Sequence, residues 1–138
     1  MLLNPVILVF VFLFGMSPLH ADENVETPVK LEGGTIVAPA QVMKWMDSKE
    51  PIFILDVRRP SHYEESHLPA ARHIFVTRLD EHLGKVPKTG KVVIYSDGPN
   101  GWKSYRAAEN LIGKGWKNIY WMREGVYGWK AAGYPLSR

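Results

Sequence analysis

Apolar and polar positions alternate along the chain in blocks that predict strands and helices in turn. A continuous apolar run at 52–55 and the segment 91–95, which is apolar after Lys91, are typical of strands buried on both faces of a sheet. Since helices are predicted between the strands, the sequence favours an α/β fold with a mainly parallel sheet covered on both faces. Shorter strands are predicted at 36–37, 74–76 and 118–121, and helices after Pro39, after Pro60 with a capping box at 61–64, and over 77–83, 103–113 and 126–132.

The first 21 residues differ from the rest because they carry no Asp, Glu, Lys or Arg. An apolar run from Val6 to Met16 is followed by Ser17-Pro18 and then by the small residue Ala21. This order is typical of a secretory signal peptide cleaved after Ala21. The alternative is an uncleaved membrane anchor, but the run is shorter than the ~20 residues of a spanning helix. We therefore expect a periplasmic or secreted protein with no stable membrane insertion after signal cleavage.

The remaining chain divides into a short leader and one domain. Residues 22–34 are largely polar and contain Pro28 and Gly33-Gly34, which predicts a flexible leader. All the predicted strands and helices fall within residues 35–138, a length that suits a single domain.

Charge and cysteine content limit the partners and the chemistry of this domain. Residues 22–72 hold nine acidic and six basic side chains, whereas 73–138 hold five acidic and eleven basic ones. The basic residues are scattered, which argues against a nucleic-acid surface and favours a small anion or an acidic partner protein. The chain contains no cysteine, so it has neither disulfides nor a thiolate nucleophile.

A loop rich in glycine, proline and asparagine follows the predicted strand at 91–95 and precedes the most regular predicted helix. Ligands of parallel α/β sheets bind outside the carboxyl ends of the strands. The loop is therefore the first candidate for a binding site. Its candidate residues are Ser96, Asp97, Gly98, Pro99, Asn100, Gly101, Trp102, Lys103 and Ser104.

Four segments, taken in order, resemble the motifs of rhodanese-like domains of the sulfurtransferase superfamily. Residues 54–58 are similar to the "IDVR" strand end of that family, and 63–74 to its "Y…GHIPGA…I" stretch. Residues 92–108 resemble its strand, active-site loop and helix, and 124–135 its closing "GG…W…AGYP" element. The resemblance covers about residues 35–137 and implies a rhodanese-like fold with about five parallel strands.

The loop departs from the family at the residue that carries the family's chemistry. It is most similar to a longer-loop subgroup of pattern C-N-G-P-x-C-W-K-S, and both cysteines are missing here. Depending on the register, the family's cysteine falls at Ser96, Asp97, Gly98 or Gly101. The resemblance therefore implies a domain without sulfurtransferase turnover, and the chain is not expected to be an enzyme of that kind.

Three further departures lie outside the loop. Ser66, Ala70 and Glu124 stand where the family usually has glycine. These changes are tolerable if the local φ angles are negative, because only glycine adopts positive φ without strain.

Without a cysteine the loop has two interpretations. Its two glycines allow a curl in which backbone N–H groups and the helix N-terminus bind an anion, with Lys103 at the rim. Asp97 opposes that use because its carboxylate repels an anion. An ordinary strand-to-helix turn, with Asn100 or Ser104 helping to cap the helix, accounts for the residues equally well. The sequence leaves both open.

Other polar residues are assigned structural roles. Asp56 and Arg58 lie at a strand end, and in similar domains such a pair ties strand ends to neighbouring loops. His62 and His67 are five residues apart and do not share a helix face. No His-Glu-x-x-His element is present, and neither a metal nor a cofactor is predicted.

The sequence thus favours a non-enzymatic binding or regulatory module that uses the loop to recognise an anion or a partner protein. One alternative is a sulfurtransferase-type protein that handles sulfane sulfur with a thiol supplied by a partner. The other is a hydrolase or phosphatase-like enzyme built on Ser96 or Asp97, although no Gly-x-Ser-x-Gly element surrounds Ser96.

Overall fold

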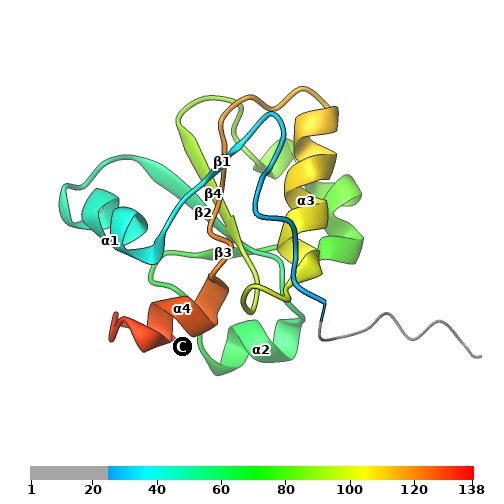
Figure 1. The fold of residues 1–138 in the computed structure, drawn as a ribbon. Helices are drawn as coiled ribbons and strands as arrows, with labels where there is room; N and C mark the ends of the chain where they lie inside the picture. The colour runs from blue at the N-terminus through cyan, green and yellow to red at the C-terminus, as the bar shows by residue number, and fades with distance from the viewer. Residues whose placement is uncertain (1–24) are drawn as a thin grey trace, which may run out of the picture.

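The computed structural model describes residues 25–138, so the predicted signal peptide, 1–21, lies outside the described residues. One parallel sheet, with the strand order β1-β5-β4-β2-β3, is covered by helices on both faces (Figure 1). The predicted α/β class is confirmed. The strands are β1 (Thr35–Ile36), β2 (Ile52–Asp56), β3 (Arg72–His73), β4 (Lys91–Tyr95) and β5 (Ile119–Trp121). The helices are α1 (Pro39–Asp47), α2 (Pro60–Glu65), the 3₁₀ helix η1 (Val76–Lys85), α3 (Trp102–Gly113) and α4 (Gly125–Ala131).

The two continuous apolar runs form the centre of the sheet. β2 and β4 pair along their whole length, from Ile52 opposite Lys91 to Asp56 opposite Tyr95. Alternate residues of both strands enter two apolar clusters, one beneath α3 and η1 and the other beneath α1 and α4. Full burial of each such aliphatic side chain contributes about 1.5–3 kcal/mol, which explains why apolar residues fill Ile52–Leu55 and Val92–Tyr95.

The segment after β2 differs from the sequence prediction. β3 comprises Arg72–His73, the two residues that directly precede the predicted strand at 74–76. Ile74 and Val76 donate backbone hydrogen bonds to Asp56 O and Val57 O, but the chain then turns directly into η1. The apolar character of 74–76 therefore reflects packing into the core rather than a longer strand. The predicted helix at 77–83 is a 3₁₀ helix with a kink at His82 (φ −128°, ψ 20°).

The helix ends are formed by the backbone rather than by the predicted side-chain caps. Pro60 occupies the first turn of α2, so Arg59 is the N-cap residue and Ser61 lies too far along to form a capping box. Gly101 is the N-cap of α3, so neither Asn100 nor Ser104 occupies the cap position that one of the two interpretations of the loop gave them. Within residues 25–138, no helix is both long and apolar enough to cross a membrane.

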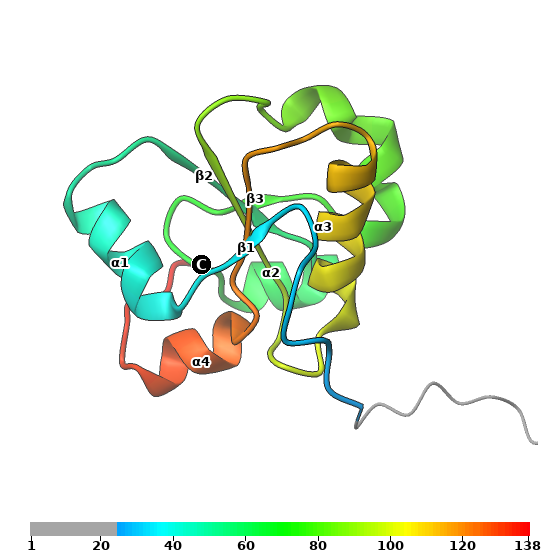
Figure 2. The same ribbon diagram turned by 45° about the horizontal axis from the view of Figure 1, so that its top comes forward.

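Residues 25–34 lie along the domain beside α3 before the chain turns into β1 (Figure 2). Leu31 is buried in the cluster beneath α3, and Thr27 is only 3% exposed. Gly33, with a φ of +79°, forms the turn that reverses the chain toward β1. Whether this segment moves, as predicted for a flexible leader, stays a prediction, but its side chains have specific contacts. We call residues 25–28 the strap.

Candidate functional site

The loop that joins β4 to α3 lies at the carboxyl end of the sheet, against the N-terminus of α4. Val126 and Tyr127, at the start of α4, donate backbone hydrogen bonds to Ser96 O (3.0 Å) and Asp97 O (2.9 Å). The first N–H groups of a helix have no acceptor within the helix, so the loop carbonyls satisfy them. Gly125 permits this close approach, because it has a φ of +59° and the loop backbone fills the space where a Cβ atom would lie.

Ser96, the first residue after β4, points into the domain and is 1% exposed. Its hydroxyl lies 2.7 Å from Ser104 Oγ and 3.0 Å from Gly101 O, and it accepts a hydrogen bond from the Ser104 N–H. Ser104 Oγ also accepts a hydrogen bond from Trp121 Nε1 (2.9 Å). Among these partners of Ser96 there is no base. A serine needs an adjacent base to act as a nucleophile, so this hydroxyl has a structural environment rather than a catalytic one.

The interior of the loop is filled. The Gly101 N–H donates to Gly98 O (2.7 Å), which closes a tight turn. A Cβ atom at Gly101 would collide with Ser96 Oγ and with Gly98 O. Gly101 O points at the Ser96 and Ser104 hydroxyls. An anion cradle needs converging N–H groups, whereas carbonyl oxygens line much of this interior.

Asp97 lies at the rim of the loop, where its side chain is 26% exposed. Its Oδ1 atom is 3.8 Å from His62 Nδ1 of α2, at the long end of the range for an ion pair. Lys103, predicted at the same rim, is half-buried and takes part in none of the ion pairs found in residues 25–138. The rim therefore combines a carboxylate with a nearby imidazole, which is not the arrangement of an anion site.

A buried polar network lies beneath the loop. Arg58 Nε and Nη2 donate to both carboxylate oxygens of Asp56, and Nη2 also donates to Ser66 O (2.7 Å). The Tyr95 hydroxyl donates to Asp56 Oδ2 (2.6 Å) and accepts from the Leu68 N–H (3.1 Å). Burial by itself lowers the pKa of Arg58. The hydrogen bonds and the negative charge of Asp56 raise the pKa by more, so it lies above its ordinary value. Burial and the neighbouring Asp56 carboxylate raise the pKa of Tyr95. The network connects the ends of two strands to the chain after α2.

The strap crosses the outer face of the loop. Both the N–H (2.8 Å) and the hydroxyl (2.5 Å) of Thr27 donate to Pro99 O. Trp102 Nε1 donates to Val25 O (3.0 Å). Arg123, which follows β5, donates to Pro28 O (3.0 Å) and Thr27 O (2.8 Å). The loop is thus fixed on its inner side by Ser96 and on its outer side by the strap.

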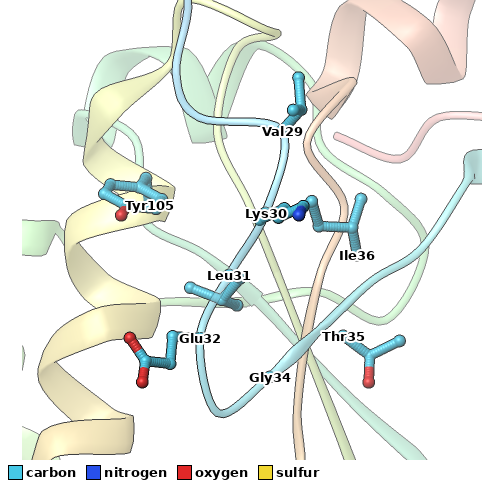
Figure 3. Close-up of a pocket in the computed structure, with 8 residues that line it drawn as sticks. All are labelled: Val29, Lys30, Leu31, Glu32, Gly34, Thr35, Ile36 and Tyr105. Atoms are coloured by element: carbon cyan, nitrogen blue, oxygen red, sulfur yellow. The ribbon is translucent and has the colours of Figure 1, made fainter.

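A cavity of about 750 Å³ lies away from the loop, between the segment after the strap, β1 and α3 (Figure 3). Lys30 and Glu32 give its lining opposite charges, and Tyr105 borders it from α3. None of the residues predicted as candidates lines it. Within residues 25–138, no group of His, Asp and Glu side chains is arranged so that it could hold a metal ion.

Sequence reasoning missed Thr27 and Arg123. Thr27 was included in the leader, and Arg123 precedes the family's closing element without belonging to a recognisable motif. They meet across 96 positions of sequence. No local pattern of residues signals such a contact. The sequence shows only a threonine followed by proline in a polar segment, which does not signal burial.

Comparisons with known proteins agree with the fold. The family model described as the rhodanese-like domain matches residues 38–132. The thiosulfate sulfurtransferase GlpE of Coxiella burnetii is 35% identical over 83 residues, which are 60% of this chain and 76% of that protein. A sulfurtransferase of Allochromatium vinosum is 26% identical over 87 residues, 63% of this chain and 79% of that protein.

Solved structures show the same fold at lower identity. A rhodanese-related protein of Thermoplasma volcanium superposes with a TM-score of 0.66 at 22% identity, over 75% of this chain and 97% of that one. Since the family model matches residues 38–132, more than half of the chain, the chain belongs to the rhodanese-like domain family. It contains no cysteine, and this separates it from the cysteine-dependent chemistry that the resemblance implies for the family.

Proposed function

We propose that this chain is an exported, non-enzymatic rhodanese-like domain whose former active-site loop is a recognition surface. The observation that carries the proposal is the environment of Ser96. At the first position after β4, a buried hydroxyl is held by Ser104 and Gly101 where a reactive group would have to be exposed. A nucleophile needs both access and activation, and Ser96 has neither.

The occupied loop interior favours a partner protein over a small anion. Carbonyl oxygens and the Asp97 carboxylate are acceptors, and they repel anions. The same obstruction weakens the alternative in which a partner supplies a thiol, because a persulfide carried by that partner needs space inside the loop. A hydrolase built on Asp97 gains no support from the site, because this side chain lies at the rim, where His62 is 3.8 Å from its carboxylate.

The test combines turnover and anion binding. The purified protein should show no thiosulfate:cyanide sulfurtransferase activity above the uncatalysed rate, because no thiolate exists to accept sulfur. Backbone amide NMR signals of the loop should not shift when thiosulfate or phosphate is added at millimolar concentration. Turnover that disappears on substitution of Ser96 or Asp97, or saturable shifts confined to the loop, would contradict the proposal.

Export rests on the apolar run of the first 21 residues and the small residue before Asp22. Cleavage there leaves a mature chain that begins three residues before Val25. Intact-mass measurement of the periplasmic or secreted form should give the mass of residues 22–138. A full-length product retained in the membrane would refute this part of the proposal.

A further inference from the structure

The outer face of the loop already binds an extended segment of peptide, the strap. Most of the contacts are made by groups that recognise any peptide backbone. Pro99 O accepts a hydrogen bond from the N–H of Thr27, the Trp102 indole donates to the carbonyl of Val25, and Arg123 donates to two further carbonyls of the strap. Trp102 and Arg123 therefore act as donors along the path of the strap. We call Pro99, Trp102 and Arg123 the strap groove.

Side chains of the strap add selectivity to this backbone recognition. The Thr27 hydroxyl donates to Pro99 O in an environment that leaves the residue 3% exposed, so a larger side chain has no room there. The Glu26 carboxylate lies 3.4 Å from Nη2 of Arg123, whose side chain is 16% exposed. Pro28 holds Thr27 in the extended region, because a residue before proline avoids helical conformations. The groove thus fits the order acidic residue, threonine, proline.

The family model matches the residues of the strap groove but does not match the strap. Pro99, Trp102 and Arg123 lie inside the segment matched by the family model, residues 38–132, whereas the strap precedes it. The domain therefore carries the binding groups, and its ligand is an appended segment. A tethered segment has an effective concentration on the order of millimolar, so it excludes weak untethered competitors.

We propose that the strap groove is a binding site for an extended peptide with the order acidic residue, threonine, proline, which a partner protein supplies and the chain's own strap occupies as an intramolecular competitor. This inference rests on the proposed recognition role of the loop and specifies its ligand. Binding in trans requires release of the strap, so strap affinity sets how readily a partner is accepted.

The test uses a fluorescent peptide with the sequence of residues 25–30 and the complete protein. In one variant the strap is weakened by Glu26→Gln with Thr27→Val, which removes the carboxylate and the threonine hydroxyl. Val29→Ala, at a 72% exposed position of the same segment, is the matched control. By fluorescence anisotropy, the weakened variant should bind the peptide at least about fivefold more tightly than the unaltered protein, since even one lost hydrogen bond gives that factor. Val29→Ala should bind as the unaltered protein does.

Two further changes in the weakened variant locate the binding. Arg123→Gln should reduce peptide affinity about tenfold or more, because it removes charged donors to two carbonyls. Trp102→Phe keeps an aromatic ring, smaller than the indole, and removes the indole N–H, so it should also weaken binding. It replaces Arg123→Gln as the test if that variant proves unstable by circular dichroism. A peptide carrying valine in place of its threonine should bind less tightly than the original.

The inference is overturned if the weakened variant binds no better than Val29→Ala, if a scrambled peptide binds equally well, or if Trp102→Phe leaves binding unchanged. Its failure is distinguishable from that of the proposed function. Lack of peptide binding together with lack of turnover refutes only the peptide site, whereas turnover refutes the non-enzymatic role whatever the peptide result.

Discussion

Gly125 holds α4 against the loop, and its replacement tests that contact directly. In Gly125→Ala the new Cβ atom would lie 2.5 Å from the carbonyl carbon of Asp97 and 2.6 Å from the carbonyl oxygens of Asp97 and Ser96. These are backbone atoms, so no side-chain rotation relieves the overlap. α4 must move away, which weakens the hydrogen bonds from Val126 and Tyr127 to the loop.

The expected cost has two parts. A side chain in the left-handed region, here at a φ of +59°, costs about 1–2 kcal/mol. Two weakened hydrogen bonds add about 1 kcal/mol each. The free energy of unfolding should therefore fall by about 3–4 kcal/mol, a large fraction of the roughly 5–15 kcal/mol that stabilises a typical domain.

Gly133→Ala is the matched control. Gly133 also has a positive φ, +75°, but no atom lies within 4 Å of the position that its Cβ would occupy. This variant should lose only the conformational part, about 1–2 kcal/mol. Urea unfolding followed by tryptophan fluorescence and circular dichroism gives both values. If Gly125→Ala costs no more than Gly133→Ala, α4 is not held on the loop and the description of a fixed recognition surface is wrong.

Three other substitutions test the site and its supports. Ser96→Cys should place a thiol among carbonyl and hydroxyl groups, so its pKa should lie at or above the ~8.5 of free cysteine, which the rate of thiol alkylation against pH measures. A thiol with a lowered pKa that forms a persulfide with thiosulfate would instead establish an anion cradle. Ala70→Gly should stabilise the domain by up to about 1 kcal/mol in thermal unfolding, because Ala70 has a φ of +63°, and no gain would show that the strain is absent. Tyr95→Phe should lower the free energy of unfolding in urea by about 1.5–3 kcal/mol, because the Asp56 carboxylate and the Leu68 N–H lose their hydrogen bonds to the Tyr95 hydroxyl. An unchanged free energy would mean that water replaces the hydroxyl.

Ala70 also shows a limit of reasoning from the sequence. A side chain is free of strain at the three positions that lack the family's usual glycine only where φ is negative. Ser66 and Glu124 have φ angles of −167° and −67°, so a side chain fits there without strain. Ala70 instead keeps the left-handed conformation, because the turn between α2 and β3 requires it, and a methyl group is tolerated at an exposed position.

The central strands could be predicted because burial on both faces leaves a pattern that depends only on neighbouring residues. Arg72 and His73 could not, because an edge strand of two residues has little apolar character. The position of the loop followed from the order of strands and helices. The inward orientation of Ser96 depends on Ser104, one helical turn into α3, and on the packing of Trp121, which no local pattern specifies.

The strand order has a consequence for how the domain is made. β1, the first strand, pairs only with β5, the last, with Thr35 opposite Tyr120 and Ile36 opposite Trp121. β1 therefore has no strand partner until nearly the whole chain is synthesised. Closing a loop of that length adds an entropic barrier that local contacts do not offset. Folding should end where the chain begins, and a nascent chain lacking β5 should keep its N-terminal segment open to proteases and chaperones.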